Sequence, residues 1–308
     1  MAATASTIKL ALAAVVVAGA TVVATCPLTA DDASAKRRGT AESTVVFFDD
    51  FSSTTLDRSK WNVRITGVTV NNEQQAYVDS PDTIYITHGD DSAGAANGAL
   101  VIQPRYRPGF TTRERRKFDF ISGRIDTKAK MEFAYGTAAA RIKLPAGAGL
   151  WPAFWALGNG RWPDTGEIDI MENVGEPDWT SVALHGRGYF GETPLVNKFY
   201  FPTDKDASAW HVYSVDWSPN GLVFRADGGV IYRATRTMVE HYGRWAFDNP
   251  KYLILNLALG GAYPVKTNGA KSPYPGIPAA TVEQIKANNV KVLVDWVRVV
   301  KNHEANGA

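Results

Sequence analysis

The chain of 308 residues has a single cysteine, Cys26, and therefore cannot form an internal disulfide. Small secreted domains need disulfides because their cores are small, whereas a chain of this length can bury a core large enough to fold without them. The chain also lacks a charge bias, with 33 basic and 31 acidic residues. This balance provides no attraction to nucleic acid or to an anionic membrane, so we expect neither as a partner.

Motifs of several enzyme classes are missing as well. The sequence has no G-x-S-x-G nucleophile elbow and no P-loop. The segment Gly186–Gly191 matches G-x-G-x-x-G, but it leads to Pro194 and a polar loop instead of a helix, which argues against a dinucleotide site. The five histidines show no metal-ligand spacing, so zinc catalysis has no support. We expect no catalytic cofactor.

The N-terminal residues have the pattern of an export signal. Lys9 precedes the apolar run Leu10–Ala24, which has the length of a signal-peptide core and is too short to span a membrane comfortably. Ala33-Ser34-Ala35 follows as an A-x-A-like cleavage site. A buried core helix is the alternative, but the terminal position and the absence of a polar face oppose it. We expect residues 1–35 to be a signal peptide and the protein to be secreted, into the medium or the periplasm.

Cys26 leaves a second possibility for the location. Val23-Ala24-Thr25-Cys26 approaches a bacterial lipobox, although Thr25 stands where Gly, Ala or Ser is expected. Lipid anchoring through Cys26 is therefore the alternative to release. Cleavage after Ala35 would instead remove Cys26 and leave a mature protein without cysteine.

Most of the remaining chain has the pattern of short strands. Four β-branched or aromatic runs are bounded by Gly, Asn, Asp or Pro: Val45–Phe48, Thr83–Ile86, Ala99–Ile102 and Val212–Trp217. Ala140–Leu144 alternates as a half-buried strand does. Asp227-Gly228-Gly229 is a good hairpin turn between Leu222–Ala226 and Val230–Tyr232. One short helix is predicted, at Ala279–Ala287 after Pro278.

Many short strands with few helices predict an all-β fold, a two-sheet β-sandwich of the jelly-roll kind. Such a sandwich can bend, and its concave face is then a cleft wide enough for a polysaccharide chain. No linker and no repeat divide the chain, so we expect one domain at residues 45–301. A short segment, residues 36–44, precedes it and a tail, residues 302–308, follows. We expect a monomer.

One basic segment interrupts the balanced charge of the chain. Arg113-Glu114-Arg115-Arg116-Lys117 contains four cations and one carboxylate. Such runs are usually solvated loops, and we expect a loop here. Contact with an anionic polysaccharide is the alternative.

Three carboxylates stand close together in the otherwise apolar stretch Gly166–Glu172. Strand side chains alternate between faces, so Glu167 and Asp169 share one face while Glu172 would point the other way. One extra residue, a β-bulge at about Met171, would return Glu172 to their face. Like charges raise each other's pKa, which keeps one carboxyl protonated while another is ionised. Retaining glycoside cleavage needs that division. An edge strand with solvated acids is the alternative.

Aromatic residues favour a site over a solvated edge. The preceding segment Leu150–Leu157 is strongly apolar and contains Trp151 and Trp155, four residues apart. Sugar rings bind on aromatic faces, so two tryptophans beside acids are typical of a saccharide cleft. Tryptophans are also ordinary core residues, and it is their combination with the acids that indicates a site.

These motifs resemble glycoside hydrolase family 16, and within it the bacterial laminarinase-type endo-β-1,3-glucanases. The likeness rests on Trp151–Trp155 followed by Gly166–Glu172, and on weaker segments between residues 45 and 301. The form with Met171 before the last glutamate is similar to the bulged members of the family. The resemblance implies a jelly-roll fold and retaining cleavage of a β-glucan.

The resemblance also implies roles for individual residues. Glu167 would be the nucleophile and Glu172 the general acid and base, a distinction that the residues alone leave open. Asp169 would hydrogen-bond one glutamate and tune its proton affinity. The remaining residues implied to contact the substrate in the cleft are Trp151, Trp155, Asn72, Arg124 and His185.

Many members of this family hold a structural calcium away from the cleft. Asp50, the Gly98 carbonyl and Asp295 match that arrangement in position. Carboxylate and carbonyl oxygens suit Ca²⁺. Asp295 could equally be a plain strand residue.

Two departures from the laminarinase pattern leave the substrate open. Arg187 stands in an unfamiliar place, and Gly261-Ala262-Tyr263-Pro264 replaces a version that contains tryptophan. The substrate alternatives are mixed-linkage β-glucan and β-1,3-galactan. A non-catalytic carbohydrate-binding module is a further alternative, but binding alone needs no pair of acids at Glu167 and Glu172.

Overall fold

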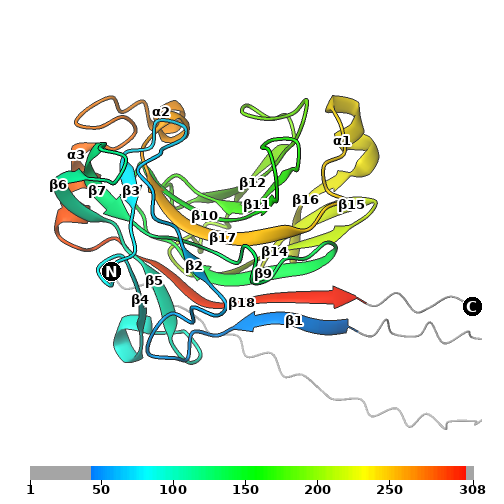
Figure 1. The fold of residues 1–308 in the computed structure, drawn as a ribbon, viewed down its shortest axis with the longest axis horizontal. Coiled ribbons are helices and arrows are strands. Elements are labelled where there is room, and N and C mark those ends of the chain that lie inside the picture. The colour runs from blue at the N-terminus through cyan, green and yellow to red at the C-terminus, as the bar shows by residue number, and fades with distance from the viewer. Residues whose placement is uncertain (1–42, 303–308) are drawn as a thin grey trace, which may run out of the picture. The chain divides into compact units, whose positions relative to one another are not determined.

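The computed structural model describes residues 43–302, and two stacked β-sheets form the body of the fold (Figure 1). The predicted two-sheet β-sandwich is confirmed. The predicted signal peptide at residues 1–35 lies outside the described residues, as do residues 36–42 and 303–308. Among the residues described, no helix is long and apolar enough to cross a membrane.

One sheet has eight strands and is the lower layer in Figure 1. Its strands are β1 (Ser43–Asp49), β4 (Ile84–Thr87), β5 (Ala99–Ile102), β9 (Gly136–Lys143), β14 (Trp210–Ser218), β15 (Gly221–Ala226), β16 (Gly229–Thr235) and β18 (Val292–Asn302). They follow the order β16-β15-β14-β9-β18-β5-β4, and β1 also pairs with β18. β18 accommodates both neighbours because β5 pairs with its first residues and β1 with its last.

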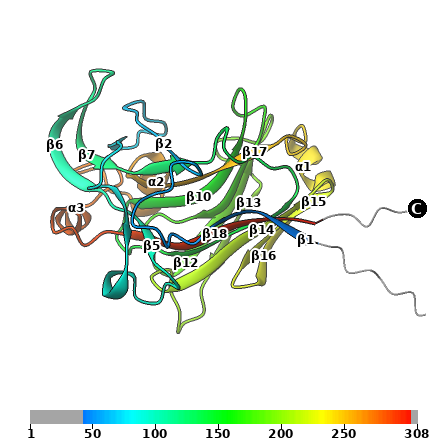
Figure 2. The ribbon, with the colours of Figure 1, turned by 60° about the horizontal axis from the view of Figure 1, so that its bottom comes forward.

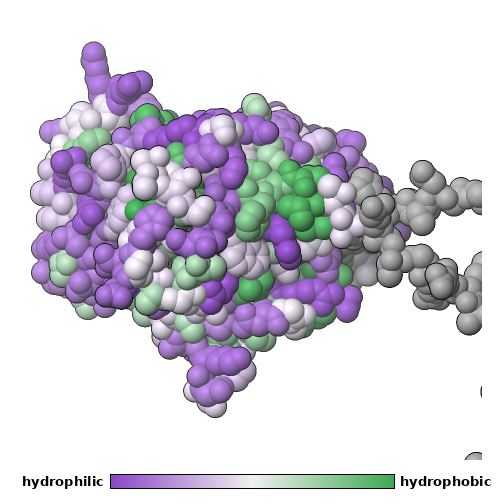
Figure 3. Space-filling view, turned by 90° about the horizontal axis from the view of Figure 1, so that it is seen from below, coloured by the Kyte–Doolittle hydropathy of each residue, from purple (hydrophilic) through white to green (hydrophobic). Residues whose placement is uncertain are grey.

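The outer face of this sheet is turned toward the reader in Figure 3, where polar residues cover much of the surface and an apolar patch interrupts them. Exposed apolar side chains on this sheet include Val45, Val46 and Phe48 of β1. Phe47 and Asp49, which flank the exposed Phe48, are buried, as the alternation of side chains along a strand requires.

The other sheet has seven strands and curves so that its outer face is concave (Figure 1). Its strands are β2 (Asn62–Val63), β8 (Arg124–Asp126), β10 (Leu150–Gly158), β11 (Glu167–Glu172), β12 (Trp179–His185), β13 (Val196–Tyr200) and β17 (Lys251–Leu259), in the order β13-β12-β11-β10-β17-β8-β2. A small third sheet, β3 (Gln75–Tyr77), β7 (Lys117–Ser122) and β6 (Arg105–Thr111), stands at one end (Figures 1 and 2).

A single hydrophobic core lies between the two large sheets. β15 alternates cleanly, with Leu222 and Phe224 buried, and the other sheet contributes Phe154 and Leu255 to the same cluster. All nine residues of β17 are buried. Burial on both faces is the reason why an interior strand such as β17 is mostly apolar instead of alternating, with Lys251 and Asn256 as its buried polar residues.

The turn between β15 and β16 has the predicted hairpin form. Ala226 pairs with Gly229, which leaves Asp227 and Gly228 as a two-residue loop. Both have positive φ, 49° and 80°, as a type I′ turn requires.

Three α-helices and one 3₁₀ helix, η1 (Gly89–Ser92), complete the described part of the chain. α3 (Ala279–Lys286) confirms the prediction, whereas α1 (Arg236–Tyr242) and α2 (Ala262–Asn268) were not predicted. Each has seven residues, too few to repeat an apolar period that the sequence could reveal. α1 is fixed locally, because the Thr235 side chain accepts a hydrogen bond from the Met238 backbone N–H.

Candidate active site

The bulge predicted in β11 is present. Asp169 pairs with Ala183 and Glu172 with Ser181, so β11 advances three residues while β12 advances two. On the other side of β11, β10 shows the matching shift in register. The extra residue turns Glu172 back to the face that carries Glu167 and Asp169, as a bulge does. The apolar residues between the acids, Ile168, Ile170 and Met171, belong to the core.

The three acids line a cleft of about 570 Å³ on the concave sheet. The lining residues are Val70, Asn71, Glu73, Tyr77, Arg124, Trp151, Ala153, Trp155, Leu157, Trp162, Glu167, Asp169, Glu172, Asn256 and Ala258. On β10 the alternation of side chains is complete. Trp151, Trp155 and their alternate neighbours face the cleft, whereas Phe154 and Ala156 enter the core.

Tryptophan N–H groups hold both glutamates. Trp151 Nε1 donates to Glu172 Oε1 at 2.9 Å, and Trp162 Nε1 donates to Glu167 Oε2 at 2.8 Å. These bonds fix the carboxyl groups and also favour their ionised forms. Trp162 was not predicted as a site residue, because the loop that contains it has no pattern that indicates its partner.

His185 lies against the acids. It pairs with Glu167 across β11 and β12, and its Nε2 atom lies 3.2 Å from Asp169 Oδ2 and 3.9 Å from Glu167 Oε1. Among residues 43–302, Glu167, Asp169 and His185 are the one group of acidic, histidine or cysteine side chains whose arrangement could hold a metal ion. His185 is not among the residues that line the cleft, and it lies beside the carboxyl groups on the neighbouring strand β12.

Burial raises the pKa of all three acids. The pKa of Glu167 rises to about 8, first because the group is buried and then because Asp169 is close. Burial raises the pKa of Asp169 well above its usual value, and the Glu172 charge adds to this effect. The pKa of Glu172 is raised by burial and lowered by the Trp151 hydrogen bond. The cluster thus retains protons at neutral pH, so acid and base forms can coexist.

At the β8 side, the cleft offers groups suited to sugar hydroxyls. The Arg124 guanidinium lies over the Trp155 ring, 4.9 Å from its centroid, and its buried Nε has no hydrogen-bond partner in the described part of the chain. Trp155 Nε1 donates to Asn256 Oδ1 at 2.7 Å, and Asn256 Nδ2 donates to the Tyr77 hydroxyl at 3.1 Å. A buried donor without a partner is a natural contact for a ligand oxygen.

The structure brings together most of the residues predicted to contact substrate. Trp151, Trp155 and Arg124 line the cleft, but Asn72 is exposed and does not, and its neighbours Asn71 and Glu73 line it instead. The sequence indicated the segment around Asn72 but not which of its side chains line the cleft, because consecutive loop residues point in different directions.

Tyr263 of α2 belongs to the segment Gly261–Pro264, for which the family pattern led us to expect a version that contains tryptophan. Its ring contacts Trp151 edge to face, with centroids 5.5 Å apart, and its hydroxyl lies 3.3 Å from Ser181 Oγ. Burial raises its pKa to about 12. Tyr263 therefore supports the tryptophan that holds Glu172.

The residues named for calcium do not fit a metal site in this arrangement. Both oxygens of Asp50 accept hydrogen bonds, from Ser52 and from the Asn97 side chain. Asp295 is buried, accepts the Ala96 N–H and pairs with Arg141 Nη1 at 2.5 Å. The positive charge beside Asp295 is thus a guanidinium, and the four carboxylate oxygens already have donors.

A concave sheet of a β-sandwich lined by three buried acids and by tryptophans is the site of an enzyme that cleaves carbohydrate chains. The model for glycosyl hydrolases family 16 matches residues 68–283 of this chain. The chain belongs to this family and is a glycoside hydrolase. The chemistry of this family uses no catalytic cofactor.

Individual relatives agree with the family. "Glucan endo-1,3-beta-glucosidase A1" of Niallia circulans is 33% identical over 282 residues, which cover 83% of this chain and 38% of that protein. "Beta-glucanase" of Rhodothermus marinus is 30% identical over 271 residues, covering 83% of this chain and 85% of that protein. The solved endo-beta-1,3-glucanase of Pyrococcus furiosus has a TM-score of 0.72 at 33% identity and covers 84% of this chain and 95% of that one.

Proposed function

We propose that the protein is a retaining endo-β-1,3-glucanase that cleaves internal bonds of laminarin-type β-glucans. The observation that carries the proposal is the β11 bulge, which brings Glu167, Asp169 and Glu172 to one wall of the cleft. The names of the relatives support the β-1,3-glucan substrate.

In this mechanism Glu167 attacks the anomeric carbon, while Glu172 donates a proton to the leaving oxygen. Glu172 then accepts a proton from the water that releases the sugar from Glu167. Trp162 and Trp151 hold the two carboxyl groups in place by their N–H donors. Asp169 is buried beside them, and the Glu172 charge together with burial raises the pKa of Asp169, so the cluster resists holding three negative charges at once.

The proposed substrate contacts follow the cleft. Trp151 and Trp155 would offer ring faces to the sugars, and Arg124 would donate its free N–H to a hydroxyl. His185 would act through the acids, since it lies beside them and outside the cleft lining. Asn72 would need a change of side-chain direction to reach the cleft, and its role stays a prediction.

The substrate is tested with purified polysaccharides. We expect rapid release of oligosaccharides from laminarin, slower release from mixed-linkage β-glucan and none from β-1,3-galactan. A clear preference for either of the other two polysaccharides would overturn the β-1,3-glucan assignment while leaving the enzyme class intact.

Stereochemistry tests the mechanism. Carboxyl groups about 5 Å apart leave no room for a water between acid and sugar, so the reaction passes through a covalent intermediate. We expect the new reducing end to appear first as the β-anomer, measured by proton NMR directly after mixing with laminarin. A first-formed α-anomer would mean direct attack by water and would remove Glu167 from the nucleophile role.

We propose that Arg141, in place of calcium, neutralises Asp295. The melting temperature should then be the same in EDTA and in millimolar calcium. A bound calcium at 100 times its Kd would add about 2.7 kcal/mol to the free energy of unfolding. A rise in melting temperature that calcium causes and EDTA reverses would instead establish the site predicted at Asp50, Gly98 and Asp295.

We also propose export by the segment at residues 1–35, because Leu10–Ala24 has the length of a signal-peptide core. The expected result is a mature protein in the culture medium or periplasm whose first residue is Lys36, measured by N-terminal sequencing. Recovery of a lipid-modified chain that begins at Cys26 would favour anchoring instead.

A further inference from the structure

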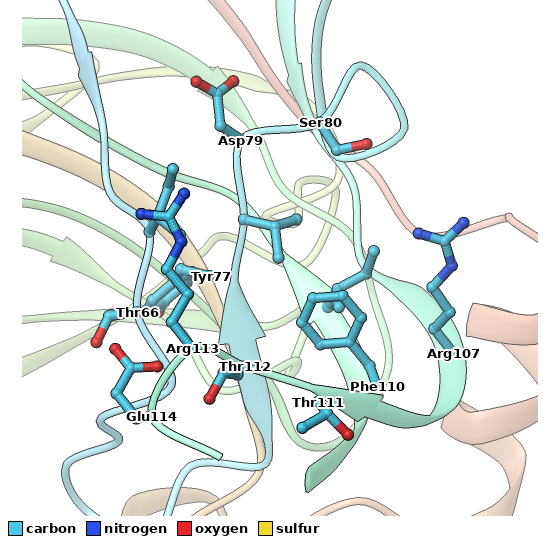
Figure 4. A pocket seen from close by; sticks show the side chains of 13 residues that line it. Thr66, Tyr77, Asp79, Ser80, Arg107, Phe110, Thr111, Thr112, Arg113 and Glu114 are labelled. Atoms are coloured by element: carbon cyan, nitrogen blue, oxygen red, sulfur yellow. The ribbon is translucent and has the colours of Figure 1, made fainter. Parts of the chain in front are cut away.

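A second cavity of about 580 Å³ lies beside the β6–β7 hairpin (Figure 4). We call it the hairpin cavity, and Thr66, Tyr77, Ser80, Arg107, Phe110 and Arg113 are among its lining residues. Tyr77 also lines the catalytic cleft, so a single residue is common to the walls of both. The hairpin itself projects from the body of the sandwich (Figure 2). The hairpin cavity and the catalytic cleft therefore adjoin the same side chain.

An irregularity in the hairpin sets the direction of two lining residues. Tyr106 pairs with Phe120 and Phe110 with Phe118, so β6 advances four residues while β7 advances two. Gly109 has a φ of 75°, and its N–H donates to Asp119 Oδ1 at 3.0 Å. Extra residues in one strand re-aim side chains. Figure 4 shows the Phe110 ring between the guanidinium groups of Arg107 and Arg113.

The hairpin has an excess of positive charge that the protein does not neutralise. Its exposed cations are Arg107, Arg113, Arg115, Arg116 and Lys117. None of them makes an ion pair within the described residues 43–302, whereas Arg58 and Arg187, which are also exposed, pair with Asp79 and Asp164. Charges that the fold leaves unpaired attract an anion from solution.

The acids near the cavity have other partners. Asp79 makes a salt bridge with Arg58 at 2.7 Å, and Asp119 accepts hydrogen bonds from Gly109 N–H and the Tyr274 hydroxyl. Glu114 accepts from the Gly67 N–H and lies next to Arg113. Two carboxylates, Glu114 and Asp119, therefore stand against the five exposed cations of the hairpin.

The chemistry of the lining specifies the ligand class. The half-buried Phe110 ring offers an apolar face of the kind that sugar rings stack on, and Thr66, Ser80 and Thr112 offer hydroxyl groups. The guanidinium groups of Arg107 and Arg113 line the cavity on either side of Phe110, and guanidinium groups suit a carboxylate or sulfate. A nucleic acid would need an extended basic groove, but the cations here gather on one hairpin of a chain with a net charge of +2. We propose that the hairpin cavity binds an acidic sugar unit of an anionic polysaccharide.

Binding at the hairpin cavity is measured without hydrolysis by using the full chain with Glu167→Gln. The cavity variant adds Arg107→Ala and Arg113→Ala. The matched control adds Arg233→Ala and Arg298→Ala, which remove the same charge from exposed positions on β16 and β18 that make no ion pair. The probes are carboxymethylated β-1,3-glucan, sulfated β-1,3-glucan and neutral laminarin, titrated by calorimetry at about 50 mM and about 200 mM salt.

We expect the cavity variant to bind at least one anionic glucan about tenfold more weakly than the control, which is the loss of about 1.4 kcal/mol of charge-assisted contact. Its affinity for laminarin should be unchanged, and its binding of the anionic glucan should depend less on salt. Phe110→Ala should weaken the same binding without altering the salt dependence. Whichever probe the cavity variant binds more weakly, carboxymethylated or sulfated glucan, identifies the acidic group that the hairpin cavity binds.

If the cavity variant and the control variant lost equal affinity for the anionic glucan, the proposal would be overturned. The same loss for single-stranded DNA or for phosphatidylserine vesicles would also overturn it, because the hairpin would then attract any polyanion. A protein with Arg107→Ala and Arg113→Ala but with Glu167 intact should hydrolyse laminarin at the wild-type rate, because the hairpin cavity is separate from the catalytic cleft. Failure of the wild type to cleave laminarin would concern the proposed function and leave this binding test unaffected.

Discussion

Replacing Glu167 by Gln is expected to lower kcat on laminarin by about 10⁴-fold or more, the effect of losing a catalytic nucleophile. An amide cannot attack the anomeric carbon as a carboxylate does, so the covalent intermediate does not form. The amide oxygen can still accept the Trp162 N–H, so the side chain should keep its place and oligosaccharides should still bind. The measurements are initial rates on laminarin and affinity by calorimetry.

Glu283→Gln is the matched control for this variant. Glu283 is exposed on α3 and pairs with Lys286, far from β11 in the sequence and outside the cleft lining. The control should retain wild-type activity. Near-normal turnover by Glu167→Gln would exclude Glu167 as the nucleophile. Asp169→Asn should be impaired less than Glu167→Gln.

Glu167→Gln should also change how the free energy of unfolding depends on pH. Burial and Asp169 raise the pKa of Glu167 to about 8 in the folded protein, so between about pH 4.5 and 8 the folded state holds a proton that the unfolded state releases. The stability that this group contributes is present below about pH 4.5 and is lost as the pH rises to about 8. Denaturant unfolding should show a smaller loss over this range for Glu167→Gln than for the wild type.

Glu172→Gln should lower kcat on laminarin by about 10²- to 10⁴-fold, the contribution of a general acid. Its distinguishing property is dependence on the leaving group. An aryl β-glucoside whose phenol leaves without a proton does not need the acid, so the first step with Glu172→Gln should approach the wild-type rate. Glu167→Gln should stay inactive on the same compound. The amide oxygen can keep the Trp151 N–H bond, so the cleft should be preserved.

Burst kinetics on the aryl glycoside measure this difference. The wild type and Glu172→Gln should both release phenol rapidly, and the variant should then slow, because water attack on the intermediate lacks its base. An equal loss of activity on laminarin and on the activated glycoside would contradict the acid and base role. If the two variants exchanged behaviours, the nucleophile would be Glu172.

The sequence by itself determined the parts of this protein that depend on neighbours in the chain. Alternation placed Glu167 and Asp169 on one face, and the inserted Met171 predicted the bulge that adds Glu172. Short β-branched runs predicted the strands of the sandwich, and the turn at Asp227 and Gly228 was found because its positive φ angles suit those residues. Such features depend on periods of two residues and on local backbone preference, which a sequence displays directly.

Only the tertiary structure decided which distant groups meet. His185 of β12 lies beside the acids of β11, and Arg141 pairs with Asp295. Nothing in the local sequence specifies these pairs, because they depend on the register of strands that are far apart in the chain. The hydrogen bond from Trp162 to Glu167 joins residues only five apart, but it depends on how the loop before β11 folds. The hairpin cavity depends on the same kind of information. The run at Arg113–Lys117 is visible as charge, but its meeting with Phe110 follows from the irregular pairing of β6 and β7.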